Sequence, residues 1–203
     1  MNRDSEYSLL LLAGGKSSRM GRDKAELLFE GKTFQQQLLD KADQAGIHKK
    51  YLSGHEGAGK DAELQTVKDR YRERGPLGGL HAGLLAAETP FCMVLPVDVP
   101  QLPAELLCRL LDAHEGLPQE ERRKPFLVKH KERTEPLIGV YPKEMADFIE
   151  KQIKEQGAPV FCVLEQWGYG CFETALPAWQ LENINTPQAY EELLRHQERG
   201  RDK

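Results

Sequence analysis

The sequence predicts an α/β fold with a mostly parallel central sheet flanked by helices. Short apolar segments of strand length alternate with amphipathic helical segments through the first half of the chain, which is typical of parallel strands joined by crossover helices. The segments at 9–12 and 91–97 are continuously apolar, as strands buried on both faces of a sheet are. Both end abruptly in polar residues, and ligands of such sheets bind beyond the carboxyl ends of the strands.

The elements of the first half follow from hydrophobic periodicity and capping residues. Thr33 and Gly46 fit the two ends of a helix over 34–45. The glycines and the proline of 75–79 mark a shaped loop before the next helix. The expected strands cover 9–12, 51–53, 64–67 and 91–97, and the other expected helices cover 80–88, with Leu80, Leu84 and Leu85 inward, and 103–114, with Pro103 in its first turn.

In the second half the sequence predicts a charged loop over 116–124, then an antiparallel hairpin and three helices. The hairpin strands are expected at 126–130 and 137–141, around a turn at 131–133. Thr186 and Pro187 fit the N-cap and first position of the final helix. The remaining expected elements are a helix from Pro142 to about Glu155, helices over 160–167 and 188–198, and a strand over 171–175.

Composition excludes several classes of function. A chain of 203 residues with a net charge of −4 and a pI near 5.9 has no global basic field for nucleic acid. No apolar stretch reaches membrane length, and the acidic N-terminus is unlike a signal peptide. The four cysteines form no C-x-x-C pair and the six histidines no ligand spacing. We therefore expect free thiols and a cytoplasmic location.

The segment 9–24 predicts a phosphate site. An apolar strand opens into Gly14-Gly15 and Gly21, interspersed with Lys16, Arg19, Arg22 and Lys24. Glycines allow backbone N–H groups to approach an anion, and the cations neutralise it. The alternative is an ordinary glycine turn with surface charges. The Walker pattern fails because Leu10 stands where it needs glycine, and no G-x-G-x-x-G spacing occurs.

Asp98 is the candidate metal ligand. It follows a run of seven apolar residues, where a carboxylate is costly unless it is solvated, paired or bound to a metal. Mg²⁺ needs one or two carboxylates together with substrate phosphate oxygens, and Asp98 opposite the glycine loop would supply one. The alternative is a turn or helix-capping aspartate before Pro100.

The motif Leu12 to Lys24, L-A-G-G-x-S-x-R-M-G-x-D-K, resembles the signature loop of the molybdenum cofactor guanylyltransferases, the MobA family of nucleotidyltransferases. Gly75-Pro76-Leu77-Gly78-Gly79 resembles the G-P-L-x-G loop of that family. Asp98-Val99-Pro100 resembles its D-x-P element, and Asn185-Thr186-Pro187 resembles its Asn-Thr-Pro. The resemblance implies a Rossmann-like nucleotidyltransferase fold in a single domain, with a nucleotide-binding half at 1–115 and an acceptor-binding half at 116–203.

The resemblance also implies roles for individual residues. Asp98 would hold Mg²⁺ with the nucleotide, and Lys24 and Arg19 would lie on the phosphates, where charge grows during transfer. The residues implied as nucleotide contacts are Leu12, Ala13, Gly14, Gly15, Lys24, Asp69, Gly75, Pro76, Leu77 and Asp98. The alternative for Asp69 is a solvated loop carboxylate. Ser53 and Glu135 depart from the family, in which several members have Asn at the first position and His is frequent at the second, and their roles stay open, as does that of Asn185.

The activity so implied is transfer of GMP from GTP to Mo-molybdopterin, with release of pyrophosphate. Lys129, Lys131 and Arg133 are the basic candidates for the anionic acceptor. Contacts with proteins that make or receive the cofactor are compatible with this activity. Two alternatives stay open: a related nucleotidyltransferase that uses CTP or a sugar phosphate, and a carrier of molybdopterin or nucleotide without turnover.

Overall fold

The computed structural model describes residues 3–13, 27–54, 64–71, 74–155, 157 and 159–201, the last three of these as backbone only. Within these residues, seven strands form one sheet in the order β5-β4-β1-β6-β8-β7-β9. The strands are β1 (Tyr7–Leu12), β4 (Lys50–Ser53), β5 (Leu64–Val67), β6 (Phe91–Pro96), β7 (Phe126–His130), β8 (Arg133–Pro142) and β9 (Gly170–Glu173). Of these, β8 alone runs antiparallel to its neighbours, so the predicted mostly parallel sheet is confirmed.

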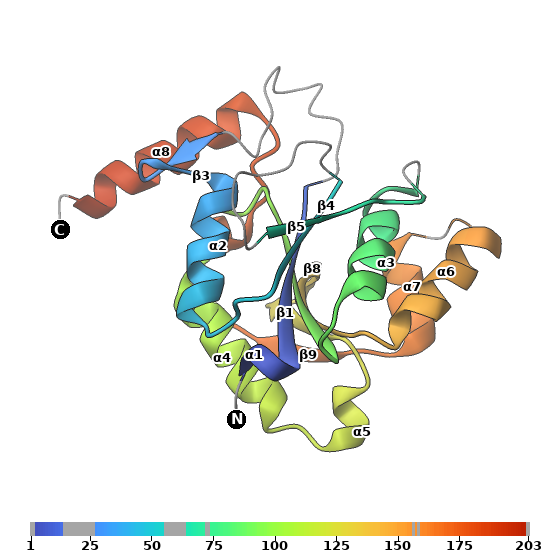
Figure 1. Ribbon diagram of the computed structural model, residues 1–203. Coiled ribbons are helices and arrows are strands. Elements are labelled where there is room, and N and C mark those ends of the chain that lie inside the picture. Colours follow the sequence, from blue (N-terminus) through green and yellow to red (C-terminus); the bar gives the residue numbers. More distant parts are fainter. Residues whose placement is uncertain are drawn as a thin grey trace.

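Helices cover both faces of this sheet (Figure 1). One layer contains α2 (Phe34–Gln44) and α4 (Ala104–Glu115), and the other contains α3 (Pro76–Ala86), α6 (Met145–Glu155) and α7 (Val160–Trp167). Strand β1 is buried along its whole length and packs against both layers. Leu9 and Leu11 belong to the core under α2 and α4, whereas Leu10 and Leu12 belong to the core under α3, α6 and α7. This alternation explains why the strand is continuously apolar in sequence.

The C-terminal helix closes a third, smaller core. Strands β2 (Leu28–Phe29) and β3 (Lys32–Thr33) form an antiparallel pair, and α8 (Pro187–Arg201) packs near them. Phe29, Phe34 and Leu193 are buried together there. The remaining elements are α1 (Arg3–Glu6), α5 (Gln119–Arg122) and a 3₁₀ helix, η4 (Ala178–Leu181). Leu27 belongs to the same core and thereby packs with the C-terminal region.

The predicted helix caps are confirmed. The Thr33 hydroxyl accepts a hydrogen bond from the backbone N–H of Gln36 at the start of α2. The Thr186 hydroxyl accepts one from Ala189 at the start of α8, 3.1 Å away. Gly46 has a φ of +79°, the left-handed conformation that glycine adopts most readily just beyond a helix.

Five predicted boundaries, orientations or elements are wrong. Helix α3 begins at Pro76, not Leu80, because Pro76 supplies the fixed φ of a first helical position directly after Gly75. Leu85 is 44% exposed and does not face the core. Pro142 ends β8, and Pro103 is the N-cap residue of α4 rather than part of its first turn. The charged loop at 116–124 contains the short helix α5.

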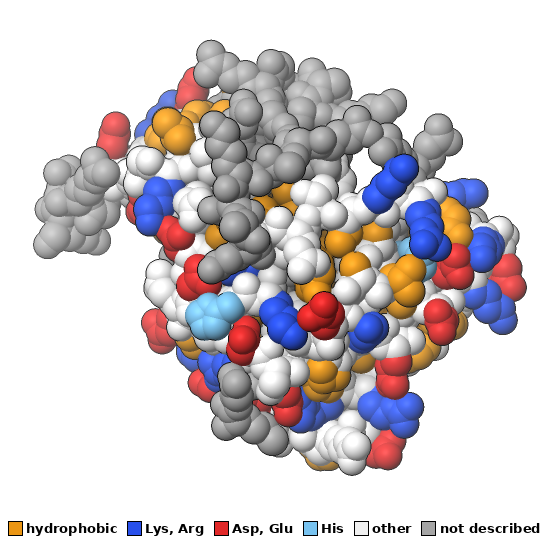
Figure 2. Space-filling model, in the orientation of Figure 1, with side chains coloured by type: hydrophobic (Ala, Val, Ile, Leu, Met, Phe, Trp, Pro, Cys, Tyr) orange, Lys and Arg blue, Asp and Glu red, His pale blue; other side chains and the backbone are white. Residues whose placement is uncertain are grey.

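Basic and acidic side chains are interspersed on the face shown in Figure 2, over the described residues, without a large field of one sign. Among the residues that the structure describes, no helix combines the length and the apolar character that a bilayer crossing requires.

The close approach of α3 to β1 depends on a glycine. A Cβ atom added at Gly83 would lie 2.2 Å from both terminal carbons of Leu10, which is fully buried. Real Cβ atoms do not approach other atoms so closely, so any side chain here would push the helix away from the strand. Gly83 thereby fixes the height of α3 above the sheet.

We expect Gly83→Ala to lower the free energy of unfolding by about 1–3 kcal/mol, because the overpacking cost exceeds the gain in helix propensity of about 1 kcal/mol. Urea unfolding monitored by circular dichroism would measure it. Gly116→Ala is the matched control, since an added Cβ there would lie at an ordinary 3.5 Å from its neighbours. A Gly83→Ala protein as stable as the control would contradict this account of α3.

Candidate active site

One row of paired residues places the candidate site at the carboxyl edge of the sheet. Leu12 of β1 pairs with Ser53 of β4 on one side and with Pro96 of β6 on the other, and Ser53 pairs with Val67 of β5. Four parallel strands therefore end at the same level. The residues that follow them emerge together at one edge, as the sequence predicted.

Two hydrogen bonds extend this alignment by one residue. The N–H of Ala13 donates to the carbonyl of Ser53 at 2.8 Å, and the N–H of Val97 donates to the carbonyl of Leu12 at 3.0 Å. The glycine loop therefore leaves the sheet directly beside the segment that leads to Asp98. The loop residues Gly14, Gly15, Arg19 and Lys24, predicted to bind phosphate, lie outside the described residues.

The backbone around Asp98 joins two distant segments of the chain. The carbonyl of Asp98 accepts a hydrogen bond from the N–H of Ile184 at 2.8 Å, which brings the predicted Asn185 motif to the same edge. Asp98 does not cap α4, because that helix begins at Ala104 and its N-cap residue is Pro103, but it does lie in a turn, as the alternative supposed. Asp98 as a whole is half-buried just beyond the end of a buried strand, and its Oδ1 atom is fully buried.

Asp69 lies against the first turn of α3. Its Oδ1 accepts a hydrogen bond from the N–H of Tyr71 at 2.6 Å. A Cβ at Gly78 would lie 2.6 Å from both carboxylate oxygens, so only glycine lets the carboxylate rest on the helix. Negative charge is favourable there because helix N-termini carry partial positive charge. Asp69 is therefore a partly exposed loop carboxylate that is held by the backbone beside α3.

The predicted Gly75–Gly79 loop is the beginning of α3 rather than a separate loop. Gly75 has a φ of +57°, and no side chain caps the helix there. Gly75 and Pro76 are exposed, whereas the Leu77 side chain is 2% exposed and packs in the core. A ligand at this edge could meet the backbone of Leu77 but not its side chain.

The side chain of Ser53 is buried between β4 and α3, which the sequence did not predict. Its side chain is 1% exposed, and its hydroxyl lies 2.6 Å from where a Cβ of Gly79 would be. Within the described part of the chain the hydroxyl has no hydrogen-bond partner. The residue type alone gave no sign of this burial, which depends on contact between β4 and α3.

The two aspartates cannot share one metal ion. They follow β5 and β6, which are three strand spacings apart, or about 14 Å. Among the described residues, no group of three or more His, Cys, Asp or Glu side chains is placed to hold a metal. A cation at Asp98 would need its other ligands from outside the described side chains, such as substrate phosphates.

The second half of the chain brings further charges to the same edge. Strands β7 and β9 run parallel to β6, and their carboxyl ends carry Lys129 and Glu173, which form an ion pair at 3.7 Å. Lys131 lies in the turn that follows β7, with a φ of +53°. Arg133 begins β8 and forms an ion pair with Glu135 at 2.8 Å. Burial raises the pKa of Glu135, although Arg133 and His130 oppose the shift.

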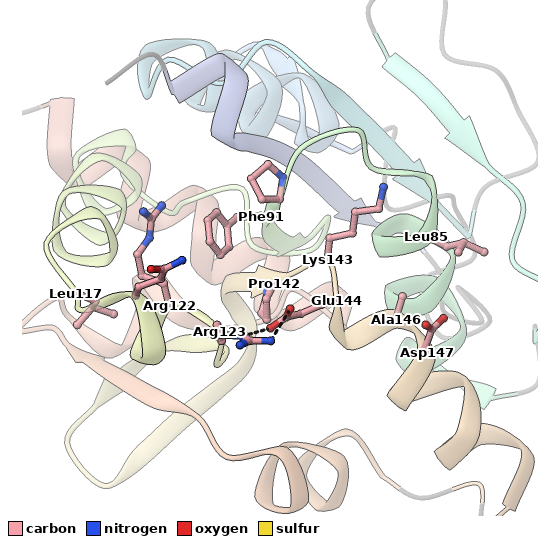
Figure 3. Close-up of a pocket in the computed structure, with 12 residues that line it drawn as sticks. Leu85, Phe91, Leu117, Arg122, Arg123, Pro142, Lys143, Glu144, Ala146 and Asp147 are labelled. Carbon is pink, nitrogen blue, oxygen red and sulfur yellow. Dashed lines mark hydrogen bonds and ion pairs between the residues drawn. The ribbon is translucent and has the colours of Figure 1, made fainter.

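A cavity of about 940 Å³ lies at the opposite edge (Figure 3). Phe91, the first residue of β6, and Pro142, the last of β8, line it, with Arg122 stacked 4.7 Å from the centre of the Phe91 ring. Its rim includes an ion pair between Arg123 and Glu144. None of the predicted site residues lines this cavity, which lies about 20 Å along β6 from Asp98.

Known proteins resemble this chain over most of its length. The family model of the MobA-like NTP transferase domain matches residues 9–167. A molybdenum cofactor guanylyltransferase of Pseudomonas paraeruginosa is 31% identical over 194 residues, which cover 94% of each chain. A probable molybdenum cofactor guanylyltransferase of Clostridium perfringens is 29% identical over 200 residues, 94% of this chain and 98% of its own.

A solved structure shows the same fold. The molybdopterin-guanine dinucleotide biosynthesis protein A of Archaeoglobus fulgidus superposes with a TM-score of 0.71 at 22% identity. The superposition covers 92% of this chain and 96% of the other. The similarity therefore includes the second half of the sheet as well as the first.

The contact of Asp69 with the backbone predicts a difference between two substitutions. We expect Asp69→Ala to lower the free energy of unfolding by about 1 kcal/mol, because the N–H of Tyr71 loses its acceptor. Asp69→Asn should cost less than half as much, since the amide oxygen still accepts this bond. Urea unfolding of both proteins would measure the difference, and equal losses would show that the hydrogen bond is not what Asp69 contributes to stability.

Proposed function

The chain belongs to the MobA-like NTP transferase family, and from that premise we propose that it transfers GMP from GTP to Mo-molybdopterin. The observation that carries the proposal is the single edge at which Ala13, Asp69 and Asp98 emerge from aligned parallel strands. The curated relatives that share nearly the whole chain support guanylyl transfer as the reaction at that edge.

The reaction needs one displacement at phosphorus. An oxygen of the terminal phosphate of the acceptor attacks the α-phosphorus of GTP, and the bond from that phosphorus to the bridging oxygen of the β-phosphate breaks. Pyrophosphate leaves with the electron pair, and the product is a guanine dinucleotide of the cofactor. The acceptor carries its own nucleophile, so the protein contributes positioning and charge neutralisation rather than a covalent intermediate.

We propose that GTP occupies the half of the edge formed by β1, β4 and β5. We place the triphosphate over the end of β1, where Arg19 and Lys24 neutralise charge that grows on the phosphoryl oxygens. The base and ribose side extends towards β5 and the first turn of α3. The residues proposed to contact GTP are Leu12, Ala13, Gly14, Gly15, Lys24, Asp69, Gly75, Pro76, Leu77 and Asp98, with Leu77 contributing its backbone.

Asp98 is the proposed ligand of a divalent cation, Mg²⁺. The fit rests on its position just beyond the end of a buried strand and on the backbone pairing that sets the end of β1 beside this segment. When bound, the ion would supply charge neutralisation and orientation of the phosphates. The single protein carboxylate is typical of Mg²⁺ sites that are completed by substrate oxygens.

We further propose that one domain binds both substrates, the nucleotide through its first half and the acceptor through its second half. The strands of the 1–115 half lie on one side of the β6–β8 boundary and the strands of the 116–203 half on the other. The acceptor would approach from the second side, past Lys129, Lys131 and Arg133.

Four free cysteines support a cytoplasmic location.

Pyrophosphate release tests this function. With purified Mo-molybdopterin and Mg²⁺, we expect release with GTP and not with ATP, CTP or UTP, and only when the acceptor is present. Asp98→Asn keeps the shape of the side chain but removes its charge, so the rate should fall by about 100-fold or more. Asp147→Asn, an exposed position on α6, is the matched control and should keep the wild-type rate.

Other outcomes would change the assignment. Release with CTP in place of GTP would leave the site intact and make the protein a cytidylyltransferase. GTP binding without release from any nucleotide, unchanged in Asp98→Asn, would contradict catalysis and indicate a carrier.

A further inference from the structure

Strand β8 is interrupted by a large bulge at its end nearest the candidate site. Leu127 of β7 pairs with Gly139 of β8, but Lys129, two residues later, pairs with Thr134, five residues away. One residue of β7 thus faces the four residues 135–138 of β8. Pro136 lies within the bulge and has no N–H to donate. Bulges re-aim side chains and are frequent beside active sites.

The bulge carries a buried carboxylate. Glu135 is 8% exposed, and Arg133 is its only ion-pair partner among the described residues. The Arg133 side chain is itself 70% exposed, so it can move with a ligand. An ionised carboxylate has about four acceptor sites, and this pair satisfies few of them. A buried carboxylate with so little support is costly for stability alone.

Glu135 lies on one particular side of Asp98 at the edge of the sheet. The β6–β8 ladder ends at the pair Val94–Gly139. Asp98 lies four residues beyond Val94, and Glu135 lies four residues before Gly139 on the antiparallel strand, so both project past the ladder towards the same edge. The glycine loop follows β1, on the other flank of β6. Glu135 therefore stands on the side of Asp98 away from the proposed nucleotide contacts.

We propose that Glu135 binds the 2-amino-4-oxopyrimidine edge of the pterin acceptor. This edge presents two adjacent donors, the ring N3–H and the exocyclic 2-amino group, which match the two oxygens of one carboxylate. Such a bidentate pair is strong and orients the ring. Arg133 would hold Glu135 in the ionised, doubly accepting form. The inference rests on the proposed function for the identity of the acceptor, and it adds the residue that recognises the ring.

The test compares two fluorescent probes that differ at one position. 6-Hydroxymethylpterin has the 2-amino donor, whereas 6-hydroxymethyllumazine has a carbonyl acceptor in its place. We expect wild type to prefer the pterin by about tenfold or more, as a bidentate pair discriminates between ring edges. Glu135→Gln, with one donor and one acceptor, should lose or reverse this preference. Glu135→Asp should keep the preference with weaker binding, because the carboxylate remains.

Glu173→Gln is the matched control. It removes the same charge at the end of β9, on the same edge, from a side chain that is 80% exposed. It should keep the wild-type preference. An unchanged preference in Glu135→Gln, or no binding of either probe to wild type at millimolar concentration, would overturn the inference.

Two further readouts separate this inference from the proposed function. Probe binding needs no turnover, so a pterin preference that depends on Glu135 would stand even if no nucleotide released pyrophosphate. If transfer occurs, Glu135→Gln should raise KM for the acceptor and leave KM for GTP unchanged. Guanosine carries the same two donors as the pterin. A Glu135→Gln protein that lost guanosine binding instead of pterin binding would therefore overturn the assignment to the acceptor.

Discussion

The whole arrangement depends on the register of β1 between its two parallel neighbours. Leu12 pairs at once with Ser53 and Pro96, so the last hydrogen bonds of three strands occur at one level. A shift of one residue would turn the side chains of β1 from one helical layer to the other. The two cores prevent that shift, because Leu10 fits against Gly83 only in this register. The register of β1 therefore fixes both the level at which the strands end and the packing of the two faces of the sheet.

The reversal of β8 has a functional consequence. Because β8 runs antiparallel to β6, its first residues, not its last, reach the edge that carries Asp98. The neighbouring β7 then runs parallel to β6 and ends at the same edge, with β9 beside it. Charged residues from both halves of the chain therefore lie along the edge that carries Asp98. A nucleotidyl transfer between two large anionic substrates needs both of them positioned at one edge, with one substrate on each side of the reacting phosphate.

Much of this fold could be predicted from local sequence because local signals determine it. The strand at 64–67 and the helix at 160–167 have the predicted bounds, and the caps at Thr33 and Thr186 are formed by the predicted side chains. Helix α3 was missed at its start because glycines have low helix propensity, whereas here they permit close packing on Asp69 and Ser53. The burial of Ser53 and the bulge at Glu135 follow from long-range pairing, which no local pattern contains.

The most direct test of the central claim is to locate the nucleotide and the metal. A crystal structure with a non-hydrolysable GTP analogue and Mn²⁺, whose anomalous signal marks the ion, would do so. The account predicts an anomalous peak within direct coordination distance of the Asp98 carboxylate and a triphosphate over the end of β1. A nucleotide bound instead in the cavity at Phe91 and Pro142, or a metal ion remote from Asp98, would contradict it.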